Sequence, residues 1–211
     1  MNNERIENAM HFYAMCCKLK DLIRKGPKTW NAKRDRIESV AEHTFGTQML
    51  AIALYYQLGY TFDLYKVLHM LAIHELDEIV MGDLAFFEKT KEQEIIEEKE
   101  AVAFVLKDFL GKDKLIDLIN EFNERKTDEA RFAYHCDKLD CDIQMKLYDQ
   151  EGCFDLNNQE NNPAFKLQSV KDAIDNESSL SNAWIEFDRS KYLDDPIFID
   201  IVNWLKNNDI K

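Results

Sequence analysis

One short stretch of the chain holds the side chains most capable of chemistry. The segment AIHELDEIVMGD, residues 72–83, places five ionisable groups within ten positions of otherwise apolar sequence. If residues 67–80 form one helix, His74 and Glu78 are four residues apart and share a face, while Glu75 lies about 100° around the helix axis from His74. Gly82 is well suited to the position after a helix C-terminus. The candidate residues are His74, Glu75, Asp77, Glu78 and Asp83.

A second histidine stands in a predicted helix upstream. Ser39 is followed three residues later by Glu42, which is the capping-box pattern of a helix N-terminus. The apolar residues after it predict a helix that runs to about Leu58. His43 falls in the first turns of this helix.

A third predicted helix carries acids among core residues. Apolar side chains recur at helical spacing over residues 128–149, and Asp137 lies between them. A buried acid needs a cation or hydrogen-bond partners. Histidine and carboxylate ligands suit a divalent metal such as Mn, Fe, Co, Ni, Zn or Mg, and ligand type alone does not choose among these ions. The candidate ligands are His43, His74, Glu75 and Asp137.

A basic segment interrupts an acidic chain. The net charge is -13, yet residues 18–36 contain eight Lys or Arg against two Asp. Such a segment is suited to binding a small anion such as phosphate. The alternative interpretation is that these charges belong to a solvated helix end and loop with no binding role. Gly26-Pro27 is expected to end the first helix, which leaves residues 28–36, including Trp30, as an ordered loop.

Composition limits the fold and the partners. Six Gly and three Pro in 211 residues supply few turns, so we expect an all-α fold in one compact domain spanning residues 1–211. The negative charge disfavours binding to nucleic acid polymers or to an anionic membrane. Five cysteines without a regular spacing form no disulfide framework, and no signal peptide or long apolar run is present, so a cytoplasmic location is expected.

Three motifs in this order resemble those of the HD-domain phosphohydrolases, and specifically the branch of 5'-deoxynucleotidases. The motifs are RIESVAEHT at residues 36–44, HELDEIVMGD at residues 74–83 and YHCDKLD at residues 134–140. The resemblance implies a helical HD-domain core over about residues 8–150, followed by a C-terminal helical extension over about 163–206. It also suggests a homodimer.

The resemblance implies a reaction and a set of roles. The reaction is hydrolysis of (deoxy)ribonucleoside 5'-monophosphates with a divalent metal held by His43, His74, Glu75 and Asp137. General acid and base duties fall to Glu78 and Asp83, without a decision as to which does which. The residues expected near the substrate phosphate and sugar are Lys28, Trp30 and Arg36, although Trp30 is equally well explained as a buried packing residue.

One departure keeps other functions open. The second residue of the central doublet is Glu75, where the family has an aspartate, and the longer side chain can shift the metal or lose it. The alternatives are an HD-domain hydrolase of nucleoside triphosphates or guanosine polyphosphates, or a non-catalytic helical binding module with a degenerate site. A cyclic-dinucleotide substrate is disfavoured because no Gly-Tyr-Pro element follows the central motif.

Overall fold

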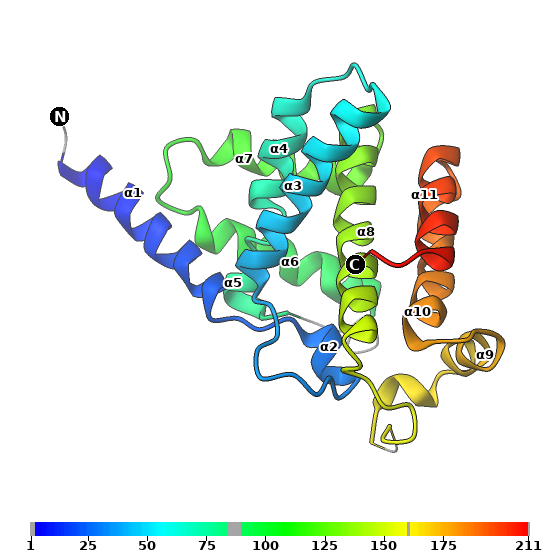
Figure 1. The fold of residues 1–211 in the computed structure, drawn as a ribbon. Coiled ribbons are helices and arrows are strands. Elements are labelled where there is room, and N and C mark those ends of the chain that lie inside the picture. Colours follow the sequence, from blue (N-terminus) through cyan, green and yellow to red (C-terminus); the bar gives the residue numbers. More distant parts are fainter. Residues whose placement is uncertain (1–2, 84–89, 160, 211) are drawn as a thin grey trace. The chain divides into compact units, whose positions relative to one another are not determined.

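The chain folds as an assembly of helices (Figure 1). The computed structural model describes residues 3–83, 90–159 and 161–210, and in these ranges β structure is limited to one isolated antiparallel bridge between Ile23 and Ser39. The predicted all-α fold class is confirmed. Of the described helices, none combines the length and the apolar character needed to cross a membrane.

The chain divides into two compact units, which are described separately. Unit 1 comprises Met1–Arg24 and Glu38–Tyr134, and unit 2 comprises Lys25–Ile37 and His135–Lys211. The single-domain organisation expected from the chain length, with a core over residues 8–150 and an extension over 163–206, stays a prediction.

Unit 1 contains most of the sequence motifs. Its helices pack as neighbours in the pairs α3 with α4, α4 with α7, and α5 with α6. The last helix of the unit, α8, continues without a break into unit 2. The elements are α1 (Asn3–Cys16), η1 (Cys17–Lys20), α3 (Val40–Leu58), α4 (Leu64–Ile73), α5 (Glu78–Met81), α6 (Lys91–Val105), α7 (Lys112–Glu124) and the start of α8 (Asp128–Gln150).

The helix predicted from residue 39 to about Leu58 is confirmed. The Ser39 side chain accepts a hydrogen bond from the Glu42 backbone N–H, and the Glu42 carboxylate accepts one from the Ser39 N–H at 2.8 Å. This reciprocal pair satisfies two of the backbone donors that a helix N-terminus leaves open. Gly59, in the left-handed conformation at φ 73°, ends the helix after Leu58.

The single helix expected over residues 67–80 is wrong, because the structure has two helices there. Helix α4 ends at Ile73 and α5 begins at Glu78, so His74 is the C-cap of α4 and Glu75 lies in the turn between them. The amide of Leu76 bonds to the Ile73 carbonyl, an i→i+3 turn that tightens the end of α4. Gly82 ends α5 at φ 76°, as the sequence predicts.

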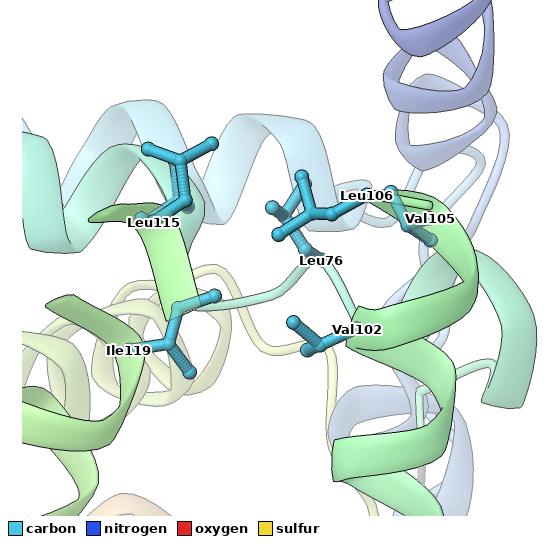
Figure 2. Close-up of a cluster of buried hydrophobic side chains, with 7 residues drawn as sticks. Leu76, Val102, Val105, Leu106, Leu115 and Ile119 are labelled. Carbon is cyan, nitrogen blue, oxygen red and sulfur yellow. The ribbon is translucent and has the colours of Figure 1, made fainter. Parts of the chain in front are cut away.

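An apolar cluster fixes this turn in place. Leu76, 3% exposed, lies between Val102 and Leu106 on one side and Leu115 and Ile119 on the other (Figure 2). Ile73 belongs to the same cluster. Burying side chains of this kind stabilises the fold by about 1.5–3 kcal/mol each. The residues that flank His74 and Glu75 are therefore held by the α6 and α7 regions.

The expectation that Gly26-Pro27 ends a helix and opens a loop is also wrong in part. Lys25–Thr29 form the short helix α2 in unit 2, and Pro27 sits in its first turn. Proline is tolerated there because the first N–H groups of a helix have no partner within it. Lys28 is thus helical, whereas Trp30 follows the helix in a turn.

Unit 2 encloses a buried hydrogen bond between two ionisable groups. The Tyr192 hydroxyl donates to Asp142 Oδ2 at 2.6 Å, and both residues are fully buried. Burial, reinforced by the charge of Asp188, raises the pKa of the Asp142 carboxyl well above its usual value. The further elements of unit 2 are the rest of α8, η2 (Pro163–Lys166), α9 (Gln168–Asn176), α10 (Leu180–Asp188), η3 (Arg189–Tyr192) and α11 (Pro196–Asn207).

Replacing the buried carboxyl should change how stability depends on pH. The unfolded chain releases the Asp142 proton near pH 4 while the folded chain retains it, so wild-type stability falls as pH rises above 4. Asp142→Asn cannot titrate at this position, so it removes this pH-dependent loss of stability. Urea denaturation should show the variant gaining stability relative to wild type between pH 4 and pH 8. Asp200→Asn, at an exposed position of α11, serves as the control. An equal pH dependence in Asp142→Asn and wild type would contradict the prediction.

Candidate metal centre

The two histidines of the motifs face one another within unit 1. The His43 side chain is fully buried on α3 and that of His74 is 2% exposed, with their ring centroids 5.6 Å apart. His74 Nδ1 lies 2.8 Å from the Leu71 carbonyl oxygen of the last turn of α4. A hydrogen on Nδ1 donates to that oxygen and leaves the lone pair on Nε2, which is the arrangement typical of a metal-ligating histidine.

The Glu75 carboxylate approaches both rings. Its Oε1 lies 3.5 Å from His43 Nε2 and 3.5 Å from His74 Nε2. The turn between α4 and α5 therefore brings the adjacent His74 and Glu75 to the same point, which a continuous helix would not do because neighbours diverge by about 100°.

The fourth predicted ligand completes the group. Asp137 is 3% exposed and lies on α8, within one turn of the point where this continuous helix passes from unit 1 to unit 2. One ligand atom from each of His43, His74, Glu75 and Asp137 lies within 4.8 Å of the other three. The Lys138 ammonium pairs with Asp137 at 2.8 Å. Asp77, another candidate from the central motif, is not part of this group.

The donor set fits a divalent cation. Metals such as Zn bind imidazole nitrogen and carboxylate oxygen at about 2.0–2.2 Å, so the ligand atoms around one ion lie roughly 3–4 Å from one another. The four candidate atoms lie within 4.8 Å of one another, so the most distant of them need to approach by about 1 Å to hold one ion. The longer Glu75 side chain reaches both histidines, so its extra methylene does not remove its oxygen from the site.

Arg24 is a site residue that the sequence did not single out. Backbone pairing of Arg24 with Glu38, next to the Ile23–Ser39 bridge, holds it beside the start of α3. Its Nη1 atom lies 3.5 Å from Glu75, 4.0 Å from Glu78 and 3.8 Å from Asp83. In the sequence Arg24 is one of eight basic residues between positions 18 and 36, and its distance along the chain from the motifs does not set it apart from the other seven.

The surrounding charges set the protonation of the acids. Burial by itself raises the pKa of Glu75, but the charge of His74, a hydrogen bond from His43 and the Arg24 guanidinium lower that pKa to about 2. Burial and the charges of Glu75 and Asp83 raise the pKa of Glu78 to about 10. Burial and the charge of Glu75 likewise raise the pKa of Asp77 to about 7.

The two predicted catalytic acids lie beside the candidate ligands. The side chains of Glu78 and Asp83 are each 10% exposed, and both approach the Arg24 guanidinium. Glu78 Oε2 is buried and has no hydrogen-bond partner among the described residues. A buried polar atom of this kind is costly unless a ligand or water completes its hydrogen bonds.

The three residues predicted to contact the substrate belong to unit 2. Lys28 and Arg36 are exposed, whereas Trp30 is only 5% exposed. The Trp30 ring packs against Phe165 and Trp184 at centroid distances of 5.5 and 6.3 Å. Trp30 is therefore a packing residue of unit 2, the alternative that the sequence left open, and a substrate role for all three residues stays a prediction.

Removal of either histidine should weaken metal binding. We expect wild-type protein purified without chelator to retain about one ion per chain by elemental analysis. His43→Ala and His74→Ala should each weaken binding by at least tenfold, since loss of a mere supporting partner of a ligand already costs 10–100-fold. His69→Ala, at an exposed position of α4, is the matched control. Full metal content in His74→Ala would exclude this centre.

Removal of Arg24 should destabilise the metal-free protein. Arg24→Gln leaves the mostly buried acids Glu75, Glu78 and Asp83 without their shared guanidinium, and we expect a loss of about 3 kcal/mol in the free energy of unfolding, chiefly from the charged Glu75. Urea denaturation after chelator treatment measures this loss. Arg5→Gln, on the exposed surface of α1, controls for the lost charge. A loss no larger than that of the control would mean that Arg24 is not the counter-charge.

Comparison with known proteins agrees with this architecture. A curated protein of Dictyostelium discoideum, 5'-deoxynucleotidase HDDC2, is 29% identical over 155 residues, which are 69% of this chain and 80% of the relative. A conserved hypothetical protein of Pyrococcus furiosus superposes with a TM-score of 0.60 at 24% identity, covering 94% of this chain and 99% of that one. A predicted metal-dependent phosphohydrolase of Magnetospirillum magnetotacticum gives 0.59 at 20% identity, covering 96% and 97%.

A family model decides the classification. The model described as HD domain matches residues 16–178, which is well over half of the chain and includes all three motifs. The resemblance to HD-domain phosphohydrolases inferred from the motifs is thereby confirmed. The chain belongs to the HD-domain family, and its doublet is His74-Glu75.

Proposed function

We propose that this chain is a metal-dependent phosphohydrolase that releases inorganic phosphate from (deoxy)ribonucleoside 5'-monophosphates. The observation that carries the proposal is the convergence of His43, His74, Glu75 and Asp137 on one point. The name of the Dictyostelium relative, a 5'-deoxynucleotidase, supports the choice of substrate.

The metal and the protein have separate tasks. A divalent cation held by the four ligands supplies Lewis acidity and lowers the pKa of water, which makes hydroxide available near neutral pH. The protein positions the phosphate and manages the protons. In the overall reaction one water adds to phosphorus, the bond from phosphorus to the 5'-oxygen breaks, and the nucleoside leaves with a proton on that oxygen.

The acids beside the centre are suited to the proton transfers. The attacking water must lose a proton and the departing 5'-oxygen must gain one, so a general base and a general acid are both needed. Glu78 and Asp83 are the two candidates, as the motif implies.

Arg24 is suited to bind the phosphate. A guanidinium matches the phosphate oxygens in shape and charge, and Arg24 Nη1 lies 3.5 Å from the candidate ligand Glu75. Arg24 also lies near the side chains of Glu78 and Asp83. We therefore assign it the anion contact nearest the metal, while Lys28, Trp30 and Arg36 keep their predicted roles toward the phosphate and sugar.

We propose that the protein acts in the cytoplasm, the location expected from the sequence. All five cysteines are free thiols, which is the usual state in a reducing compartment. A small nucleotide substrate is a cytoplasmic metabolite, so the location and the reaction agree.

Phosphate release from a substrate panel tests the reaction. The panel contains 2'-deoxy and ribo 5'-monophosphates of each base, assayed with Mn, Co, Ni, Mg or Zn. Wild type should release phosphate in a metal-dependent manner, Glu78→Gln should lower kcat by about 10²–10⁴-fold, and His69→Ala should match wild type. Absence of release from wild type with every metal would overturn the proposed substrate class.

Two additional measurements separate the alternatives. Nucleoside triphosphates and guanosine polyphosphates, with product identification, test for another HD-domain hydrolase. The variant Glu75→Asp restores the family doublet, and its gain of activity over an inactive wild type would identify a site disabled by the longer acid. Silence from wild type and Glu75→Asp on every substrate would support the non-catalytic binding module.

A further inference from the structure

Unit 1 contains a cavity apart from the candidate metal centre. Its volume is about 390 Å³, and its walls come from residues 8–18 and 104–109, that is from α1, the start of η1, the end of α6 and the turn that follows. Pockets that take small ligands in proteins have volumes of about 300–1,000 Å³. This cavity is therefore large enough for a small molecule.

The floor of the cavity is apolar and is held by the core. Phe12 and Met15 of α1 line it and pack against the apolar cluster that anchors the turn between α4 and α5. Phe109 does the same from the other wall, and its ring centroid lies 4.6 Å from that of Phe12. Val105, which also lines the cavity, is itself a member of the cluster (Figure 2). The floor is thus preformed by the packing of the free protein.

The rim of the cavity carries an excess of positive charge. Lys18 comes from η1 and Lys107 from the turn after α6. The Lys107 ammonium lies 5.4 Å from the ring centroid of Phe104, a wall residue that is 54% exposed. Asp108 is the one acidic side chain in the described lining, so with His11 neutral the balance is 2 - 1 = +1, in a chain whose net charge is -13. The pairing of Lys107 with Asp108 at 3.9 Å joins exposed side chains and is weak.

The apolar floor and the basic rim together select a class of ligand. An apolar chain removes the floor from water, and an anionic head remains at the rim beside the lysines. A nucleobase is less suited, because its polar edges need hydrogen-bond partners and the floor offers only the weak acceptor of the Met15 thioether. Inorganic phosphate alone would leave the floor uncovered.

We propose that this cavity binds an aliphatic carboxylate of short to medium chain length. The chain lies on the floor formed by Phe12 and Phe109, and the carboxylate lies beside Lys18 and Lys107. The volume, near the lower end of the range for ligand pockets, sets the limit on chain length. This inference is independent of the proposed reaction.

Isothermal titration calorimetry on the full chain, with octanoate as the probe, tests the site. Wild type should bind octanoate, and each CH₂ removed should weaken binding about fourfold, so hexanoate should bind roughly 15-fold more weakly. Octan-1-ol, which has the same chain without the charge, should also bind more weakly. Equal binding of octanoate and octan-1-ol would overturn the assignment of the anionic head, and absence of octanoate binding would overturn the site.

Two variants with matched controls locate the ligand. Lys18→Glu should weaken octanoate binding at least fivefold, because it replaces an attraction by a repulsion, whereas Lys99→Glu, an equal change at an exposed position of α6, should bind like wild type. Ala14 is an exposed wall residue of α1, so Ala14→Trp should fill the cavity and abolish binding. Ala53→Trp, at an exposed position of α3, should leave binding unchanged. Circular dichroism and melting temperature check that each variant is folded.

Competition separates this site from the metal centre. Inorganic phosphate and a deoxynucleoside 5'-monophosphate should leave octanoate binding unchanged, since the proposed reaction places both at the metal centre. Displacement of octanoate by either of them would place the carboxylate there and overturn the proposal. Undiminished binding in Ala14→Trp would overturn it as well.

Discussion

The arrangement of unit 1 depends on the need to neutralise negative charge in a poorly solvated place. Glu75, Glu78 and Asp83 have side chains only 10–15% exposed, and an isolated carboxylate is costly to bury, so Glu78 holds its proton while Glu75 keeps its charge. The Arg24 guanidinium lies near all three acids. The imidazoles of His43 and His74 both approach the Glu75 carboxylate. A bound divalent cation would meet the same need, so the electrostatics that hold the cluster together also favour a metal.

That charge cluster can form only because a helix is interrupted. Along an unbroken helix the side chains of His74 and Glu75 would diverge, whereas the turn between α4 and α5 directs both to the imidazole of His43. The interruption is stabilised from behind. Ile73 and Leu76, on either side of the doublet, are anchored in the apolar cluster formed with the α6 and α7 regions (Figure 2). The apolar core thereby sets the geometry of the polar site.

Helix α3 connects the two kinds of surface in unit 1. Its inner face buries Val40, Thr47 and Ala51 together with the candidate ligand His43, whereas Phe45, Met49 and Tyr56 are exposed on the other side.

The sequence by itself determined the all-α class, the capping box that starts α3, the positive-φ glycine that ends α5, and the four candidate metal ligands, because these depend on local spacing and on the chemistry of each side chain. It did not determine the break after Ile73, the short helix around Pro27, or the place of Arg24. Those were decided by tertiary contacts. Leu76 leaves the helical path to enter a core built from distant residues, and Arg24 reaches the acids through a backbone pairing with Glu38, fourteen positions away. Periodicity records which side chains are apolar, but the partner that buries each one is fixed only when the chain folds.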